Sequence, residues 1–235
     1  MQADMNLIET KDELKVPWAL REIVFATIGV IVLSLAVIFA TQFWGLSTNI
    51  VLIVYELVYL IPVLAIVLLK KAKWEVLGLR RFSLENLAIG CGMLFMTYII
   101  IMIHNLALMG LGIAPQGEYI AEIFGMDIDL WVLGISVMVV APITEEIFFR
   151  SFVFGGLTEK YGWKKATFIS AFVFGAAHMQ LVAFIPTFLM GLVLAYLYQR
   201  SKSVFPGIIL HFTVNAFGFL MIYLSTLLPE SLPYV

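Results

Sequence analysis

Long blocks of hydrophobic positions alternate with short polar connections along this 235-residue chain. A helix needs about 20 apolar residues to cross the hydrocarbon core of a bilayer, and most of these blocks reach that length. The pattern predicts an all-α, polytopic membrane helix bundle with about seven transmembrane helices, six to eight being possible. The predicted helices cover residues 23–43, 48–69, 84–113, 130–158, 165–179, 184–199 and 204–228. The fifth and sixth are short, and they are either two full spans or a tilted, re-entrant pair.

The composition agrees with this pattern. Hydrophobic residues make up 62% of the chain, its mean hydropathy is +1.02, and 13% of its residues are charged. A soluble domain carries about 25% charged residues. The single cysteine, Cys91, excludes an internal disulfide and a cysteine-based metal cluster. Residues 1–16 are polar and mixed in charge, so no removable signal peptide is expected.

The basic residues predict an orientation in the cell membrane. Thirteen of the fourteen Lys and Arg residues precede the first predicted helix or lie in the second, fourth and sixth connections. Because basic connections stay on the cytoplasmic side, the N-terminus is expected in the cytoplasm and the C-terminus outside. Residues 1–21 then form a cytoplasmic segment, and residues 22–235 form a single transmembrane domain. The third connection, on the outer side, is acidic and carries Glu118, Glu122, Asp127 and Asp129.

Charged and polar side chains interrupt the apolar helices at a similar depth. Glu145, Glu146 and Arg150 lie in the fourth predicted helix, where ionisable groups are costly and normally mark a functional site. At a rise of about 1.5 Å per residue, Glu145 lies roughly 22 Å from the nearest basic connection. Polar residues of later helices lie roughly 14 to 21 Å from their own basic connections. These residues are His178, His211 and Asn215. The agreement in depth indicates one site near the middle of the membrane.

The local spacing of these residues suggests their roles. Glu146 and Arg150 are four apart with the acid first, which favours an ion pair on one helix face. Glu145 is turned away from that pair by about 100°. A carboxylate beside a buried histidine can act as a general base on water. An imidazole near a carboxamide, such as His211 and Asn215, can donate hydrogen bonds to an oxyanion. Together these groups are typical of the active site of a hydrolase whose nucleophile is water.

Structural explanations compete with the functional ones for several residues. The Glu146 and Arg150 pair can simply hold helices together, and Asn215 can bridge two helices. His104, in the third predicted helix, is expected to be a satisfied interior hydrogen-bonding residue. Glu56, in the second, is expected either to line the cavity or to pair with a neighbour.

Three short motifs occur in order on successive predicted helices: Glu-Glu-x-x-x-Arg, Phe-x-x-x-His and His-x-x-x-Asn. Their residues are Glu145, Glu146, Arg150, Phe174, His178, His211 and Asn215. In these motifs the chain resembles the CPBP family of intramembrane proteases, also called the CAAX-protease or Abi family, which includes the type II prenyl endopeptidases. The resemblance covers a signature core of residues 135–220. One departure is Ser151, where many members have glycine after the arginine.

The resemblance implies an intramembrane endopeptidase that needs no cofactor. Glu145 and His178 would activate the water, and His211 and Asn215 would form the oxyanion site. The supporting residues would be Glu146, Arg150 and Phe174. A zinc-dependent version, with the metal held by Glu145, His178 and His211, ranks second, because two histidines and a carboxylate can form an open zinc site. The implied partners are the lipid bilayer and a peptide or protein substrate, which the resemblance allows to be lipidated or membrane-bound, and no nucleic acid.

Two other functions are compatible with the same residues. A non-catalytic membrane protein that binds a peptide or lipidated partner, as in immunity to a bacteriocin, would carry a similar polar cavity. A carrier or proton relay also uses buried carboxylates. The chain lacks the paired inverted halves of many transporters, so the endopeptidase is the leading hypothesis.

Overall fold

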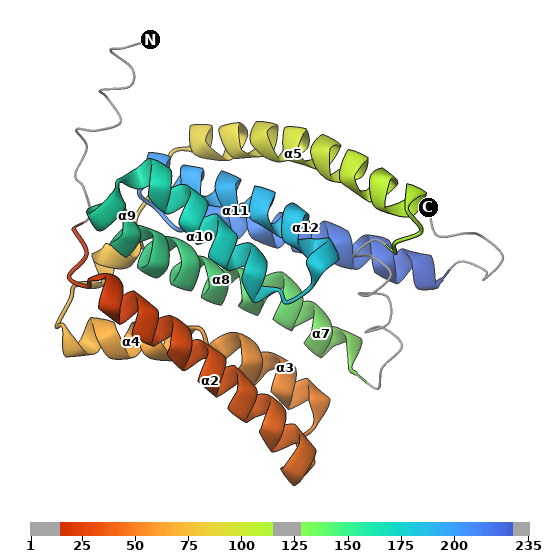
Figure 1. The fold of residues 1–235 in the computed structure, drawn as a ribbon, viewed down its shortest axis with the longest axis horizontal. Coiled ribbons are helices and arrows are strands. Elements are labelled where there is room, and N and C mark those ends of the chain that lie inside the picture. Colours follow the sequence, from red (N-terminus) through yellow and green to blue (C-terminus); the bar gives the residue numbers. More distant parts are fainter. Residues whose placement is uncertain (1–14, 115–127, 228–235) are drawn as a thin grey trace.

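The computed structural model describes residues 15–114 and 128–227, and within them the chain forms helices joined by short turns (Figure 1). The α-helices are α2 Leu20–Trp44, α3 Thr48–Leu57, α4 Leu60–Leu69, α5 Leu84–Gly110, α7 Leu130–Ile135, α8 Ala141–Glu145, α9 Gly155–Tyr161, α10 Trp163–Ala177, α11 Leu181–Ser201 and α12 Phe205–Thr226. The other elements are the 3₁₀ helix η1 Trp74–Leu77 and the π-helices η2 Ser136–Val140 and η3 Glu146–Phe154. Most of the predicted N-terminal segment lies outside the described residues, as do Glu118, Glu122 and Asp127.

Six helical runs in the described part of the chain are long and apolar enough to cross a membrane. They are Leu20–Trp44, Thr48–Leu69, Leu84–Gly110, Leu130–Tyr161, Leu181–Ser201 and Phe205–Thr226. The prediction of an all-α, multi-pass membrane bundle is therefore confirmed. The fifth predicted helix, α10, is indeed short, with 15 residues. The sixth, α11, is not: it begins at Leu181 instead of residue 184 and has 21 residues.

The second predicted helix is interrupted. The run Thr48–Leu69 divides into α3 and α4 at Val58 and Tyr59. Pro62 explains the break, because proline has no N–H for the carbonyl four residues earlier and its ring crowds that carbonyl. The Val58 carbonyl instead accepts a hydrogen bond from the N–H of Ile61 at 3.3 Å. A hydropathy pattern does not register this interruption, since both halves are apolar.

The run Leu130–Tyr161 lies at the centre of the bundle. Helices α3, α4, α10, α11 and α12 pack against its α8 and η3 segments. The surrounding core is rich in fully buried aromatic side chains: Phe148, Phe149, Phe152, Phe154 and Phe174. In a lipid environment such interlocking side chains stabilise helix association through van der Waals packing. The central helix is therefore fixed in rotation, and with it the direction of its charged side chains.

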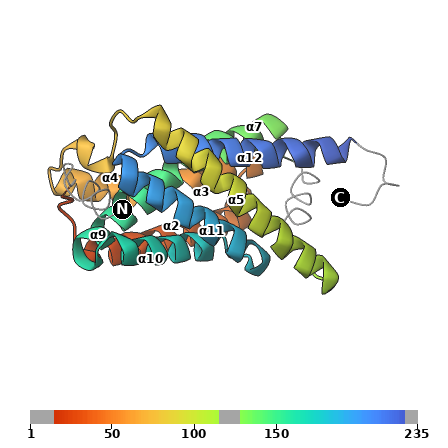
Figure 2. The same cartoon turned by 90° about the horizontal axis from the view of Figure 1, so that it is seen from above.

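Helices α10 and α11 form a tightly packed hairpin. A Cβ added at Gly191 would lie 2.9 Å from the Cα of Ala171, so the two backbones approach as closely as small residues permit. Met179, in the turn between them, has a positive φ of 54°. Figures 1 and 2 show that this turn lies short of the far ends of α5 and α12. His178, which adjoins this turn, therefore lies between the two ends of the bundle and not at one of them.

Several basic connections lie together at one end of the bundle. Lys70, after α4, contacts Glu22 at the start of α2 at 3.0 Å. The hydroxyl of Ser203, between α11 and α12, donates to the carbonyl of Arg80 at 2.7 Å. Figure 2 shows α9 at the same end as α4. This arrangement is the one that the basic-residue rule requires, while the face of the cell membrane on which this end lies stays a prediction.

Candidate active site

Two π-helical segments flank the predicted base. The segment η2 precedes α8, and η3 begins at Glu146, directly after Glu145. In η2 the N–H of Ala141 donates to the carbonyl of Ser136, five residues earlier. Pro142 contributes to this widening, because its missing N–H and its ring are incompatible with the α-helical bond at that point. Single π turns are rare and concentrate at functional sites, so the backbone singles out this position independently of its charges.

Side chains from neighbouring segments donate to the carbonyls of η3. The hydroxyl of Ser170, on α10, donates to the carbonyl of Phe149 at 3.0 Å. The indole Nε1 of Trp18, before α2, donates to the carbonyl of Phe152 at 3.0 Å. These bonds satisfy buried backbone acceptors from outside the helix and fix η3 to its neighbours.

Ser151, the departure from the family's pattern, is fully buried within η3. Its hydroxyl donates to the carbonyl of Leu77 at 2.6 Å. A buried hydroxyl without a partner would cost at least about 1 kcal/mol, and this one has a partner. The serine therefore ties η3 to η1 and leaves the packing intact.

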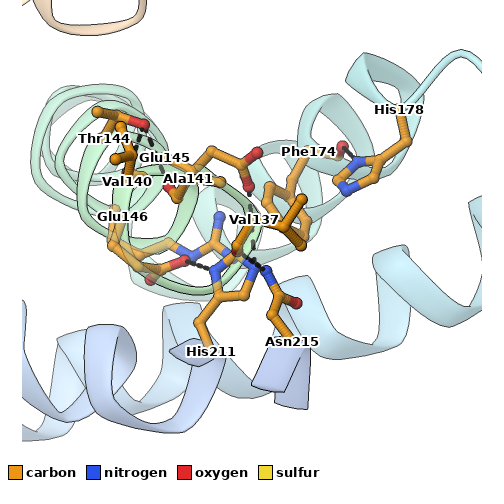
Figure 3. Close-up of polar contacts among 11 residues, drawn as sticks. Val137, Val140, Ala141, Thr144, Glu145, Glu146, Phe174, His178, His211 and Asn215 are labelled. Carbon is orange, nitrogen blue, oxygen red and sulfur yellow. Dashed lines mark hydrogen bonds and ion pairs between the residues drawn. The ribbon is translucent and has the colours of Figure 1, made fainter. Parts of the chain in front are cut away.

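Glu146 joins the central helix to the last one. Its Oε2 lies 3.2 Å from Nε of Arg150, and its Oε1 accepts a hydrogen bond from Nδ1 of His211 at 3.2 Å (Figure 3). The side chains of Glu146 and Arg150 are 0% and 1% exposed, so the predicted ion pair is present and buried. A Cβ added at Gly207 would lie 2.8 Å from Oε2 of Glu146. The absence of a side chain at Gly207 therefore lets α12 rest directly on the carboxylate.

Charge and stacking, more than hydrogen bonds, hold the guanidinium of Arg150. Its contact with Glu146 lacks hydrogen-bond geometry, and no described residue accepts a hydrogen bond from its three nitrogens. Its Cζ lies 4.3 Å from the ring centre of Phe174, a cation–π arrangement. The Phe174 ring also contacts the imidazoles of His178 and His211, at centroid distances of 4.9 and 5.9 Å. Phe174 thus connects the ion pair to both histidines.

Glu145 lies on the other side of His211. Its Oε2 is 3.9 Å from Nε2 of His211, so this imidazole lies between the two acids. The side chain of Glu145 is 13% exposed, which leaves it accessible to water. Glu56 of α3 lies within electrostatic range of Glu145, and its Oε2 is buried without a hydrogen-bond partner among the described residues. Glu56 therefore lies next to the candidate site.

Hydrogen bonds orient the remaining polar side chains. Nδ2 of Asn215 donates to the carbonyl of Val137 in η2 at 2.8 Å, which leaves one N–H of the amide for another acceptor. Nδ1 of His178 donates to the carbonyl of Phe174, one turn earlier, at 2.9 Å. In the neutral ring this bond leaves Nε2 free to accept a hydrogen bond. No hydrogen bond or ion pair joins His178 to Glu145 in the described part of the chain, so their action on one water stays a prediction.

A cavity of about 270 Å³ lies beside these residues. His178, His211 and Asn215 line it together with Phe174, whereas Glu145 is not among its lining residues and adjoins it through His211. Glu145 and Glu146 thus flank His211, which lines the cavity together with His178 and Asn215. Most of the remaining wall is apolar.

The contribution of α5 to this cavity was not predicted. Leu94, Thr97, Tyr98 and Ile101 line it, although the first three predicted helices carry no motif. A single threonine or tyrosine in an apolar block gives no signal that would distinguish a cavity wall from a lipid-facing surface. His104, further along α5, is not among the lining residues, and its Nδ1 lies 3.2 Å from Oδ1 of Asn105.

A zinc site needs at least three donor side chains that converge on one ion. Among the described His, Cys, Asp and Glu side chains, no group of three is placed so that it could hold a metal ion. The alternative zinc site of Glu145, His178 and His211 therefore does not fit this geometry.

Residues 127–217 match the family described as type II CAAX prenyl endopeptidase Rce1-like. This segment contains all three motifs, so the resemblance of these motifs to the family is confirmed.

Two curated relatives are similar to parts of the chain. A Bacillus subtilis (strain 168) protein named "Putative membrane peptidase YdiL" is 39% identical over 83 residues, which are 35% of this chain and 34% of that protein. A Lactococcus lactis subsp. lactis (strain IL1403) protein named "UPF0177 protein YxdF" is 31% identical over 105 residues, which are 44% of this chain and 55% of that protein. The chain thus matches about a third and about half of the length of these relatives. No solved structure is significantly similar to it.

Proposed function

We propose that the protein is an intramembrane endopeptidase that uses water as its nucleophile. The observation that carries the proposal is the contact of His211 with both Glu145 and Glu146 beside a cavity that also contains His178 and Asn215. The match to the type II CAAX prenyl endopeptidase family supports the reaction class. The substrate is a peptide or protein reached within the cell membrane, and the N-terminus lies in the cytoplasm.

Glu145 acts as the general base in this proposal. It takes one proton from the water while the water oxygen attacks the carbonyl carbon of the scissile bond. Nε2 of His178 accepts a hydrogen bond from the second O–H and so orients the attack. When the tetrahedral intermediate collapses, the C–N bond breaks and Glu145 returns its proton to the departing amine nitrogen. The products are a carboxyl group and an amine.

The oxyanion of the intermediate is stabilised by Asn215 and His211. Asn215 has one amide N–H that is not used by Val137, and a donor fixed in this way is effective because it does not need to reorganise. His211 already donates Nδ1–H to Glu146, so it contributes as a second donor when Nε2 also carries a proton. The ion pair of Glu146 and Arg150 holds His211 in position.

Replacement of Glu145 by glutamine tests the proposal. The purified wild-type protein and E145Q are incubated in detergent with a defined pool of peptides, some ending in a prenylated cysteine plus three residues and some unmodified, and products are identified by mass spectrometry. We expect cleavage by the wild type and a loss of at least about 100-fold in E145Q, which keeps the shape of the side chain but removes the base. The matched control is E159Q, because Glu159 is exposed on α9.

Equal products from the wild type and E145Q would remove Glu145 as the base. Binding of a peptide by both proteins, with no product from either, would favour the non-catalytic binding protein. The same assay in the presence of the chelator EDTA tests whether cleavage depends on zinc, and we expect the cleavage rate to be unchanged.

A further inference from the structure

The cavity beside the proposed active site combines a cluster of polar groups with a largely apolar wall. His178, His211 and Asn215 supply the cluster, and Tyr98 of α5 adds a phenol. The rest of its lining comes mostly from apolar side chains of α5, α7, α11 and α12, among them Leu94, Ile101, Leu133, Met190, Val214 and Ile222. A ligand that fills this cavity must therefore combine a polar group at the histidine end with an apolar group extending away from it.

The two threonines of the wall also present apolar surface. The hydroxyl of Thr97 donates to the carbonyl of Met93 at 2.9 Å, and that of Thr187 donates to the carbonyl of Ala183 at 2.7 Å. Both hydroxyls are satisfied by their own helices. A ligand in the cavity therefore does not need to supply a hydrogen-bond acceptor for either hydroxyl.

The size of the cavity selects the kind of apolar group. Its volume of about 270 Å³ exceeds the ~150 Å³ of an engineered dry cavity that binds benzene. From Asn215 to Ile222 it follows seven residues of α12, roughly 10 Å along the helix axis. A branched or aromatic amino-acid side chain fits within that depth, whereas a fully extended long isoprenoid chain would project beyond it.

Gly218 leaves part of this space open. It lines the cavity one turn after Asn215, and a Cβ added there would meet no atom within 4 Å. Gly191 and Gly207 differ, because an added Cβ would collide with Ala171 and Glu146 respectively. A helical glycine costs about 1 kcal/mol relative to alanine, and close packing does not explain this cost at Gly218.

We propose that the cavity receives a bulky apolar side chain of the substrate residue next to the scissile bond, and that Gly218 sets the size it accepts. The inference rests on the proposed endopeptidase activity. A scissile carbonyl held by His211 and Asn215 places the Cβ of its own residue at the border between the polar end and the apolar wall. The side chain then extends along α12 past Gly218.

Sets of otherwise identical unmodified peptides test this assignment. The residue on each side of the cleaved bond is varied among Ala, Leu and Phe, and kcat/KM is measured for the wild type, G218L and the control G92L. Gly92 is a suitable control because it lies on α5, an added Cβ there meets no atom within 4 Å, and it is not among the lining residues. We expect the wild type and G92L to prefer Leu or Phe over Ala by about tenfold or more at the residue that carries the scissile carbonyl. In G218L that preference is lost or reversed, while the Ala peptide is still cleaved.

The outcomes separate this inference from the proposed function. No cleavage of any peptide, unmodified or prenylated, beyond that of E145Q would end both. Cleavage by the wild type with the same preference in folded G218L would end the assignment of Gly218 alone. Cleavage only of prenylated peptides, whatever their neighbouring side chains, would show a lipid in the cavity and overturn the proposal. If G218L does not fold, M190F, which narrows the cavity from α11, must show the same change in preference.

Discussion

Replacement of Arg150 by methionine tests whether the buried ion pair stabilises the central helix. The Nε of Arg150 lies 3.2 Å from Oε2 of Glu146, and both side chains are at most 1% exposed. At this distance and an effective dielectric constant of about 20, Coulomb's law gives an attraction of about 5 kcal/mol. Removing one partner of a buried pair typically costs about 3–5 kcal/mol, because the other charge is left uncompensated. The hydrogen bond from His211 remains and partly stabilises the carboxylate.

We therefore expect R150M to lower the free energy of unfolding by about 3–5 kcal/mol. The assay is reversible unfolding by SDS in mixed micelles, followed by the fluorescence of the five tryptophans. The control is R200M, because the Arg200 and Glu85 pair is 29% and 66% exposed. An exposed pair contributes about 0–1 kcal/mol, so R200M should stay within that range.

A double-mutant cycle isolates the pair itself. If the charges interact directly, the combination of E146Q with R150M should be less destabilised than the sum of the two single changes, by more than about 1 kcal/mol. An R150M protein within about 0.5 kcal/mol of the wild type would refute the reasoning, since that is the range of an ordinary surface substitution. Strict additivity of the two changes would show that the contact contributes through packing alone.

Two further changes test contacts around the site. G207A should reduce cleavage at least about tenfold, because an added Cβ would lie 2.8 Å from Oε2 of Glu146 and must displace it. The control G29A should cleave normally, since a Cβ at Gly29 meets no atom within 4 Å; equal activity of the two variants would contradict the placement of Glu146. W18F should lower the free energy of unfolding by about 1 kcal/mol through loss of the hydrogen bond to the carbonyl of Phe152, measured by the same SDS titration. Its cleavage rate should not change, and an unchanged stability would show that this bond does not anchor the N-terminal segment.

The positions of the helices could be predicted because the thickness of the hydrocarbon core sets the length of each apolar block. The bounds of the first predicted helix, 23–43, differ from those of α2 by at most a few residues. The bounds of the last, 204–228, differ from those of α12 by a similarly small amount. The break at Val58 and Tyr59 and the π turns around α8 were missed, because they depend on prolines and on packing that hydropathy does not encode.

The parts of the site that could be predicted are those set by local spacing. The Glu146 and Arg150 pair lies within one turn and follows from the i,i+4 rule. The contact of His211 with Glu146 joins residues 65 apart, and that of Asn215 with Val137 joins residues 78 apart. Such partners depend on how the helices pack. The depth of each residue along its helix therefore indicated that the polar side chains lie at a similar level in the membrane, but not which of them are in contact. The use of one amide N–H of Asn215 by a backbone carbonyl is the clearest example.

The π-helical backbone also makes the length of this segment matter. The hydrogen bond of a π turn encloses one residue more than that of an α turn, so η3 behaves like an α-helix with one residue inserted. Deleting a single residue there would permit regular α geometry, and the segments on either side would keep their rotational phase. The same deletion in a neighbouring α-helical segment would instead rotate everything on one side of it by about a quarter of a turn. A one-residue gap in η3 would therefore remove the widened turns while Glu145 and the aromatic cluster still face their present neighbours.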